Sequence, residues 1–467
     1  MARTMVINVA GLSQVLAAEI PCLAALARRG VSLGLEPVLP AVTCTMQATL
    51  TTGELPSRHG IISNGLYFFD TAEVRFWEQS AHLVNAPRAW DLPMRNAEGG
   101  MRSEKQKARQ PSTPHSAPRT PHSKVAMLFW QQCLYGTADV LLTPKPIHGP
   151  GDQLISYCYS RPADLYDRLV AGESALEPGK PRGPFNLMHY WGPMAGLGSS
   201  RWIADASLAV WRQDKPDLML TYLPHLDYSG HRAGPDAPAH HVAAKELEPL
   251  LAALIAAAEA DGARTIVLSE YSFVPVRRAA ALNRALREAG MLALREVAGA
   301  EYLYPGDSRA FAMVDNQVAH IYFPNTRDLA ADLRKAKEVI TGLDGVAEVL
   351  DREALAERGL DHVRSGELVA LAEPDAHFTY YWWLDDAKAP PFARTVDIHA
   401  KPGFDPAELL IDMARRHIPL SADGIRGSHG LVDGSGKGWG VFIAAGLPKG
   451  MAGRKSLRAA EVAHLLL

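Results

Sequence analysis

The segment Leu218-Met-Leu-Thr-Tyr-Leu-Pro-His-Leu-Asp-Tyr-Ser-Gly-His231 decides the fold of this chain, because a strand-like apolar run leads directly into two possible metal ligands. Residues 218–223 predict a buried strand, and Asp227 follows just beyond its carboxyl end. Open α/β sheets place their ligand sites at that end of the strands. The segment therefore indicates an α/β fold with Asp227 and His231 in its functional site.

Apolar runs and helical patterns alternate along the rest of the chain. Strands are expected at residues 5–9, 31–35, 218–223, 265–268 and 440–445. Helices are expected at residues 21–29, 43–52, 240–260 with an interruption at Pro249, 283–289 and 459–467. This alternation predicts a sheet with helices on both faces.

Residues 96–124 depart from this rhythm, because they are rich in Ser, Pro, Gln, Lys and Arg and contain Met101 as their one large apolar side chain. Such a segment buries too little apolar surface to offset the entropy of ordering. We predict a disordered insertion here, and the alternative is a basic binding arm.

A second departure covers about residues 323–391, which carry their own strand–helix–strand signals. Residues 310–314 and 318–323 are typical of a pair of strands, and residues 329–340 are typical of a helix. We assign residues 326–389 to a small inserted cap, and residues 1–325 and 390–467 to the core.

Composition excludes several classes of protein. The chain has 467 residues, 47% of them hydrophobic, and a formal net charge of −3, so it can bury a substantial core and has no positive field for a nucleic acid polymer. No run reaches the roughly 20 apolar residues of a membrane span, and no signal peptide is visible. We expect a cytoplasmic protein with free cysteines. Its oligomeric state cannot be read from the sequence.

His429 can join Asp227 and His231 at one metal ion. It lies in the glycine-flanked stretch Arg426-Gly-Ser-His-Gly430. Two imidazoles and one carboxylate leave a coordination position open, which is typical of a catalytic site and suits zinc, manganese or iron. Read one at a time, Asp227 could instead be a helix cap and each histidine a surface residue.

Thr43 is the candidate nucleophile, because it opens a predicted helix whose amino end favours an anionic group. A threonine hydroxyl needs activation, which a coordinated metal can provide. The alternative is a helix-capping threonine. Gln47 could reach a phosphate oxygen or serve packing, and His59 and Asn64 are expected to hold a turn beneath the site.

Five motifs together resemble the alkaline phosphatase superfamily, most closely its type I phosphodiesterase/nucleotide pyrophosphatase family, with phosphonoacetate hydrolase as a cousin. They are Pro40-Ala-Val-Thr43, Thr52-Gly53, Pro56-Ser-Arg-His59-Gly-Ile61, Asp227 and His231 followed by Gly234-Pro235, and Gly427-Ser-His429-Gly430. The resemblance implies a three-layer sandwich with a mostly parallel sheet and a small inserted α+β cap. It also implies hydrolysis of phosphate or phosphonate esters of a small phosphorylated substrate through a phosphothreonine at Thr43.

The family resemblance further implies two metal ions, usually zinc. Asp227, His231 and His429 would hold one of them. The other would be held by Thr43, an Asp after the first strand and a later Asp-His pair, but this chain has Ala10, Glu270 and Tyr271 at those positions. Glu270 could still coordinate as a longer carboxylate, and the Tyr271 hydroxyl could donate to a phosphate oxygen.

Other residues could replace the missing ligands of the second ion. The candidates are Asn8, Asp397, His399 and Asp405. We therefore predict one zinc ion and leave the second open. Two other functions stay open at this point: a non-catalytic binding or scaffold protein with a degraded second metal site, and a phosphomutase.

Overall fold

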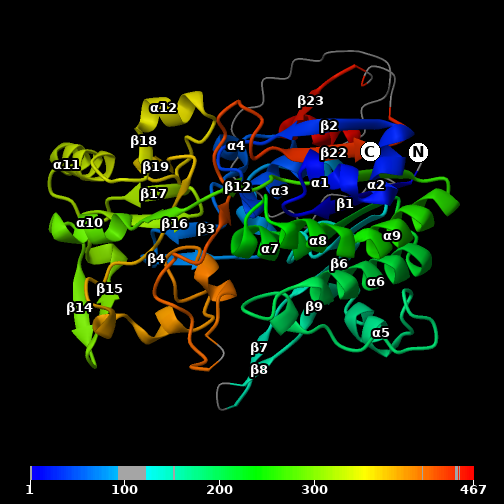
Figure 1. The fold of residues 1–467 in the computed structure, drawn as a ribbon, viewed down its shortest axis with the longest axis horizontal. Helices are drawn as coiled ribbons and strands as arrows, with labels where there is room; N and C mark the ends of the chain where they lie inside the picture. Colours follow the sequence, from blue (N-terminus) through cyan, green and yellow to red (C-terminus); the bar gives the residue numbers. More distant parts are fainter. Residues whose placement is uncertain are drawn as a thin grey trace.

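The fold of this chain is α/β, a three-layer sandwich with a second, smaller sheet beside it (Figure 1). The structure is a computed structural model that describes residues 3–92, 123–150, 153–412, 414–447, 451 and 453–466. The insertion predicted at residues 96–124 lies outside the described residues, except for its last two positions.

The large sheet has nine strands. Their order is β23 (Ser456–Arg458), β2 (Val31–Glu36), β22 (Gly440–Ala444), β11 (Arg264–Leu268), β1 (Thr4–Val9), β10 (Leu218–Leu223), β5 (Val125–Leu128), β6 (Val140–Pro144) and β9 (Cys158–Arg161). The run from β11 to β6 is parallel throughout, whereas β22 and β9 pair with their neighbours antiparallel. The prediction of a mostly parallel central sheet is confirmed.

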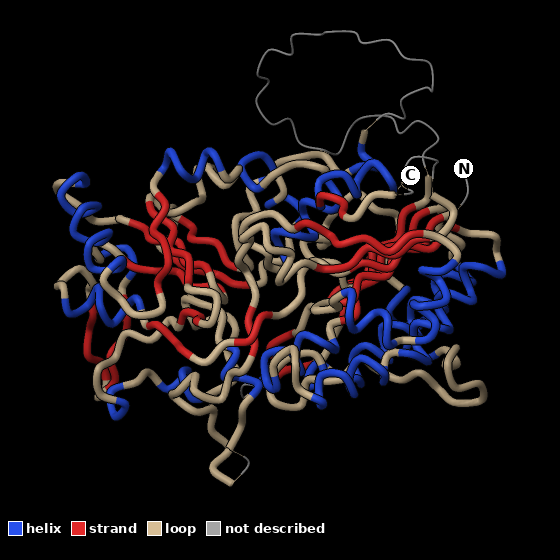
Figure 2. Tube along the Cα trace, turned by 45° about the horizontal axis from the view of Figure 1, so that its top comes forward, coloured by secondary structure: helices blue, strands red, loops and turns tan. Residues whose placement is uncertain are grey.

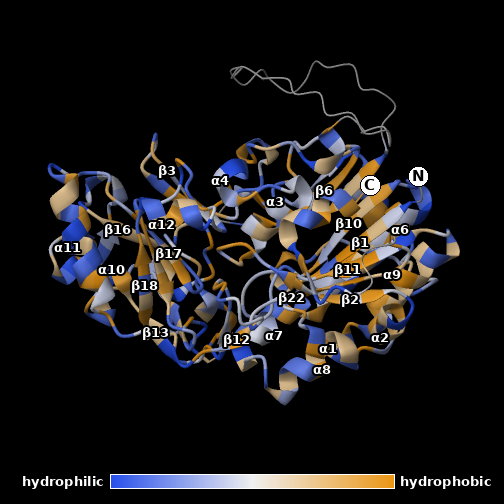
Figure 3. Cartoon of the chain, turned by 90° about the horizontal axis from the view of Figure 1, so that it is seen from above, coloured by the Kyte–Doolittle hydropathy of each residue, from blue (hydrophilic) through white to orange (hydrophobic). Residues whose placement is uncertain are grey.

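Apolar side chains on both faces of β1 create the three layers. Met5 and Ile7 pack into one cluster, under α1 (Gln14–Glu19), α2 (Pro21–Arg28), α6 (Leu197–Gln213) and α9 (Glu248–Ala260). Val6 packs into the opposite cluster, under α3 (Thr43–Thr52) and the 3-10 helix η9 (Ala459–Leu465). Successive side chains of a strand point to opposite faces, so β1 needs apolar residues at every position that a helix covers. Figure 3 shows the hydrophobic colouring of these central strands.

The structure confirms the interruption of one expected helix and changes the type of another. The helix expected at residues 240–260 is divided into α8 (Pro238–Glu246) and α9, with Pro249 in the first turn of α9, as the sequence predicts. The terminal helix is a 3-10 helix, η9, rather than an α-helix. No helix in the described residues combines the length and the apolar character that crossing a membrane requires.

The smaller sheet is antiparallel, in the order β16 (Phe311–Asp315), β17 (Val318–Tyr322), β19 (Leu368–Ala372) and β18 (Val346–Leu350). Helices α10 (Leu282–Glu288), α11 (Leu329–Thr341) and α12 (Arg352–Glu357) lie beside it (Figures 1 and 2). Its first two strands precede residue 326, so the boundary assigned at residues 326–389 divides this sheet. The boundary divides the sheet because β17 is hydrogen-bonded to β19, which lies about 50 residues later in the chain, and not to a strand of the large sheet.

Shorter elements connect these layers. The remaining helices are α4 (Pro56–His59), α5 (Leu165–Ala171) and α7 (His225–Ala233), with 3-10 turns η1 (Ala81–Leu83), η2 (Ala89–Asp91), η4 (Leu187–His189), η5 (Pro305–Asp307), η6 (Asp386–Lys388), η7 (Pro391–Arg394) and η8 (Pro406–Leu409). The remaining strands are β3 (Gly65–Phe68), β4 (Glu73–Phe76), β7 (Ile147–His148), β8 (Leu154–Ile155), β12 (Val274–Pro275), β13 (Arg278–Ala280), β14 (Leu294–Val297), β15 (Ala300–Leu303), β20 (Ala376–Phe378) and β21 (Gly427–Ser428).

Strand β22 can lie next to β11 only because residue 440 is a glycine. A Cβ atom at Gly440 would lie 1.9 Å from the carbonyl oxygen of Ser269. We expect Gly440→Ala to lower the free energy of unfolding by roughly 1–3 kcal/mol or more, because backbone rather than a movable side chain blocks the methyl group.

Urea unfolding measures this effect. Gly342→Ala is the matched control, because Gly342 is exposed at the end of α11 and its nearest neighbour would lie 3.5 Å from the added Cβ. Equal stabilities of the two variants would contradict the packing argument.

Candidate functional site

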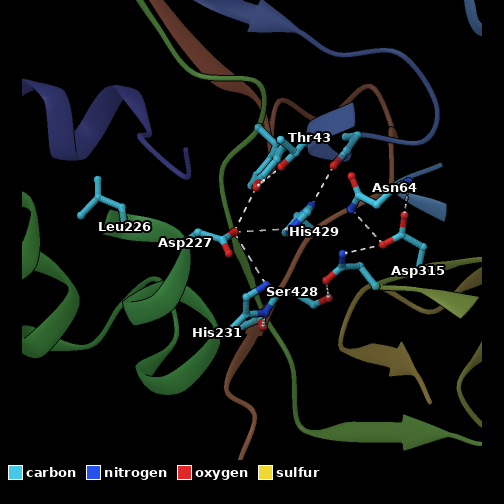
Figure 4. Close-up of polar contacts among 12 residues, drawn as sticks. Thr43, Asn64, Leu226, Asp227, His231, Asp315, Ser428 and His429 are labelled. Carbon is cyan, nitrogen blue, oxygen red and sulfur yellow. Dashed lines mark hydrogen bonds and ion pairs between the residues drawn. The ribbon is translucent and has the colours of Figure 1, made fainter. Parts of the chain in front are cut away.

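Helix α7 carries two of the predicted metal ligands on one face. It begins directly after β10, and Asp227 and His231 lie four residues apart on it, which is about one helical turn. The third ligand, His429, follows β21. Asp227 Oδ1 lies 3.8 Å from His231 Nε2 and 3.9 Å from His429 Nε2 (Figure 4). The structure thus brings all three predicted ligands to one point.

Hydrogen bonds orient both imidazoles for coordination. Nδ1 of His231 is 3.0 Å from the Gly427 carbonyl oxygen, and Nδ1 of His429 is 2.8 Å from the Ala41 carbonyl oxygen. A carbonyl oxygen only accepts, so each Nδ1 carries the proton and each Nε2 presents its lone pair toward Asp227.

Burial keeps these imidazoles neutral. It lowers the pKa of His231 to about 4 and holds the pKa of His429 well below its ordinary value. Nε2 of His231 is a buried atom without a hydrogen-bond partner. Among the described residues, Asp227, His231 and His429 form the one group that could hold a metal ion, with their ligand atoms within 4.8 Å of one another. Neutral imidazoles beside a carboxylate fit a divalent cation.

Thr43 lies at the amino end of α3, beside this group. Its side chain is buried, and its hydroxyl oxygen lies 3.0 Å from the Tyr271 hydroxyl oxygen. The N-cap residue of α3 is Val42, so Thr43 is not the helix-capping threonine considered as an alternative. An anionic group bound at Thr43 would face the positive end of the α3 dipole.

Glu270 is not in the metal group. Its Oε1 atom accepts hydrogen bonds from Asn8 Nδ2 at 2.8 Å and from Gln47 Nε2 at 2.6 Å, and Oε2 has no partner. Burial raises the pKa of Glu270 to about 8. Gln47 also accepts from the Gln131 backbone amide at 2.7 Å, so both ends of its amide are occupied within the protein.

Tyr271 joins Thr43 to the predicted metal group. Its hydroxyl donates to Asp227 Oδ1 at 3.0 Å. Its ring stacks on His429, with a centroid distance of 3.6 Å and an interplanar angle of 5°. Tyr271 and Phe273 form a small apolar cluster with Ala41.

Of the four residues considered as replacements for missing ligands, Asp397, His399 and Asp405 do not join the metal group. Asn8 donates a hydrogen bond through Nδ2 to Glu270 Oε1, and its Oδ1 has no partner. Asp397 accepts from the backbone amides of its own loop, and His399 is exposed. Asp405 is buried in an ion pair with Lys401 at 2.8 Å.

A cavity opens in front of Thr43, and aromatic side chains shape it. Its aromatic walls include Trp77, Tyr190, Trp191, Tyr228 and Phe404. Three of the aromatic residues between positions 66 and 200 therefore reach the cavity, whereas Phe129 and Trp130 lie in the cores of the two helical layers.

The charged lining of this cavity is mostly acidic. Lys401 is the one Lys or Arg among its described lining residues, and it lies 2.8 Å from Asp405 and 2.7 Å from Glu408. The two carboxylates offset its charge. The cavity therefore presents no unpaired Lys or Arg to a chain of phosphates.

Sequence reasoning missed the contribution of the smaller sheet. Asp315, at the end of β16, accepts hydrogen bonds from Ser63 Oγ at 2.6 Å and from the Asn64 side chain at 3.1 Å. Asn64 Oδ1 in turn accepts from the Cys44 backbone amide at 2.9 Å, so this contact holds the start of α3. Asn316, with a φ of 58°, also lines the cavity. The Asp-Asn pair in a tight turn between two strands was the available signal.

His59 has the supporting role that the sequence suggests for it. One ring nitrogen lies 2.9 Å from the Thr49 hydroxyl, and the other accepts from the Ile61 backbone amide at 3.1 Å. Burial lowers the pKa of His59 to about 3, so the ring is neutral. These bonds tie the loop after α3 to α3 itself.

Comparisons with known proteins concern the family and the fold of this chain. A family profile described as type I phosphodiesterase / nucleotide pyrophosphatase matches residues 4–405. Phosphonoacetate hydrolase from Sinorhizobium meliloti 1021, solved with phosphonoformate, is 16% identical with a TM-score of 0.56, over 99% of this chain and 94% of that chain. Murine ectonucleotide pyrophosphatase / phosphodiesterase 5 is 13% identical with a TM-score of 0.57, over 99% of this chain and 93% of that chain. No protein with a curated description matches the sequence.

Glu270 predicts a pH dependence of stability in the metal-free protein. Its folded pKa is raised from 4.5 to about 8, so the folded state binds the proton more tightly than the unfolded state. Its contribution is fully present below about pH 4.5 and is lost as the pH rises through about 8. Gln cannot ionise. As the pH is raised from 5 to 8.5, we therefore expect the free energy of unfolding of Glu270→Gln to rise by a few kcal/mol relative to that of the parent protein.

Thermal unfolding in a chelator at both pH values measures this difference. Asp227 titrates in both proteins, so only its electrostatic coupling to Glu270 differs between them. Glu357→Gln, at an exposed position on α12, is the control and should leave the pH profile of the parent unchanged. Parallel profiles for the parent and Glu270→Gln would contradict the expectation.

Proposed function

Because this chain belongs to the type I phosphodiesterase/nucleotide pyrophosphatase family of phosphoric ester hydrolases, we propose that it hydrolyses phosphate or phosphonate esters with Thr43 as the nucleophile. The observation that carries the proposal is the convergence of Thr43, Asp227 and His429 on one cavity. A scaffold protein would have no need to keep a threonine hydroxyl and an oriented two-histidine, one-carboxylate group around the same space.

Asp227, His231 and His429 would hold one divalent cation. Two imidazole nitrogens and one carboxylate oxygen suit zinc, and three protein ligands leave a position open for substrate. When bound, the cation supplies a Lewis acid that offsets negative charge on the reacting phosphoryl group.

The chain's own residues perform the remaining steps. Thr43 Oγ1 forms a bond to phosphorus as the bond to the leaving-group oxygen breaks, and the threonine proton is transferred to that departing oxygen. The product alcohol departs, and a phosphothreonine remains. Water then attacks phosphorus, the bond to Thr43 breaks, and the threonine hydroxyl is restored. The amino end of α3 favours the anionic phosphoryl group throughout.

The cavity favours a small ester whose non-phosphate part is aromatic or apolar. The aromatic side chains around Thr43 offer flat apolar surface, and Lys401 is already paired with Asp405 and Glu408. A triphosphate chain would meet these two carboxylates without a free cationic partner. We therefore propose diesters or phosphonate monoesters with an aryl group as better substrates than nucleoside triphosphates.

Removing the proposed nucleophile is the direct test. We expect Thr43→Ala to reduce kcat/KM on bis-p-nitrophenyl phosphate and p-nitrophenyl phenylphosphonate by roughly 1,000-fold or more, because Thr45, the next hydroxyl on α3, does not line the cavity. Release of p-nitrophenol is the measurement. Recovery of p-nitrophenyl phosphate and phenylphosphonate as the co-products shows hydrolysis, whereas a new ester would show transfer to another acceptor. Thr71→Ala, an exposed threonine outside the cavity, is the control. Undiminished turnover by Thr43→Ala would reject the mechanism.

Removing a proposed ligand tests metal binding separately. We expect His231→Ala to lose most of the zinc that the parent protein retains after dialysis, because Nε2 supplies one of three protein ligands. Plasma mass spectrometry of the dialysed protein is the measurement. His464→Ala, at an exposed position, is the control and should retain the parent's metal content. Full retention by His231→Ala would contradict the assignment.

A further inference from the structure

We propose that Tyr271 takes the place of a second metal ion in this chain, which therefore binds one divalent ion, and that its hydroxyl positions Thr43. The role of Thr43 rests on the proposed function. The number of bound ions does not rest on it and can be measured without any substrate.

Two of the three donors that a second ion would need beside Thr43 are missing, at positions 10 and 271. The resemblance places its other ligands at positions 10, 270 and 271. The Ala10 side chain is a buried methyl group without a donor atom. Oε1 of Glu270 is hydrogen-bonded to the amides of Asn8 and Gln47, at 2.8 and 2.6 Å, which leaves only its Oε2 without a partner. The structure therefore does not fit a second ion, although it fits the first.

Aromatic groups fill the surroundings of these positions. A Cβ atom on Gly11, next to Ala10, would lie 2.8 Å from the Phe273 ring, and one on Gly230 would lie 2.3 Å from it. Phe273 therefore occupies the space between the end of β1 and α7. The Phe273 and His231 rings meet edge to face, with a centroid distance of 4.9 Å. The apolar Phe273 ring can hold the His231 ligand in place. It offers no donor atom to a second cation.

The Tyr271 hydroxyl connects Thr43 to Asp227 of the predicted metal group. Its oxygen lies 3.0 Å from Thr43 Oγ1 and 3.0 Å from Asp227 Oδ1. A phenol has one proton, and a carboxylate oxygen can only accept. Tyr271 donates to Asp227, so Thr43 must donate to Tyr271. This direction leaves the lone pairs of Thr43 Oγ1 available to an electrophile in the cavity.

Neighbouring bonds fix the position of Tyr271. Its ring is held flat against His429, with a centroid distance of 3.6 Å. The preceding Glu270 ties the end of β11 to Asn8 on β1 and to Gln47 on α3, one turn after Thr43. The Ser269 hydroxyl donates to the Tyr271 carbonyl oxygen at 2.6 Å. Tyr271 is therefore a positioning residue whose distance from Thr43 is set by contacts to three elements.

Metal content is the first test. Protein loaded with excess zinc and then dialysed should contain one zinc ion per chain by plasma mass spectrometry. The triple variant Ala10→Asp, Glu270→Asp and Tyr271→His supplies the donors that the family pattern has, and it should bind two. Two ions in the parent protein would overturn the inference. One ion in a folded triple variant would overturn the assignment of these three positions.

A single variant tests the positioning role even if the triple variant does not fold. Tyr271→Phe keeps the ring on His429 and removes the bonds to Thr43 and Asp227. We expect it to retain one zinc ion and to lower kcat roughly tenfold with little change in KM, since a hydrogen bond that aligns the nucleophile is lost. Tyr322→Phe is the matched control, because it removes a buried tyrosine hydroxyl from β17, where it donates to the Arg364 carbonyl oxygen at 2.8 Å.

The two readouts separate failure of this inference from failure of the proposed function. A parent protein with one zinc ion and no turnover of any ester would reject the function and leave the metal count standing. Unchanged kcat in Tyr271→Phe, with an active parent, would reject the positioning role alone. Loss of zinc in Tyr271→Phe would show that Tyr271 supports the first metal rather than Thr43, and would also overturn the inference.

Discussion

The close approach of α7 and β21 is the constraint on which the site depends. A Cβ atom at Gly427 would lie 2.3 Å from the Gly230 carbonyl oxygen, so only glycine allows the two backbones to come this near. The Gly427 carbonyl then accepts from His231, and His429 follows two residues later. The same contact thus sets the tautomer of one ligand and the place of another.

Burial disfavours the charged forms of the carboxyl groups and histidines in this site. Desolvation raises the pKa of Asp227 to about 7 and that of Glu270 to about 8, and it lowers the pKa values of both histidines. A cation bound at Asp227 would stabilise its charged form, whereas Glu270 has only amide donors beside it. The two carboxyl groups therefore divide into one suited to a metal and one suited to a buried hydrogen-bond network.

The smaller sheet is part of the site rather than an appendage to it. Through Asp315 it holds Asn64, and through Asn64 it holds the first turn of α3, where Thr43 lies. The loops that follow it bring Lys401, Asp405 and Phe404 to the cavity. Changes in this sheet would therefore reach the nucleophile and the walls of the cavity without touching the core sheet.

The sequence by itself determined the features that depend on local periodicity. The apolar run before Asp227 predicted the strand, the four-residue spacing placed Asp227 and His231 together, and the glycine-flanked His429 completed the group. Tertiary structure decided what replaces the missing ligands. It places the Tyr271 hydroxyl between Thr43 and Asp227. It also directs Glu270 toward Asn8 and Gln47, and it pairs Asp405 with Lys401. It also decided the extent of the smaller sheet, whose strands pair across long loops. Spacing along one element follows from its geometry, but contacts between residues hundreds of positions apart depend on how the elements pack.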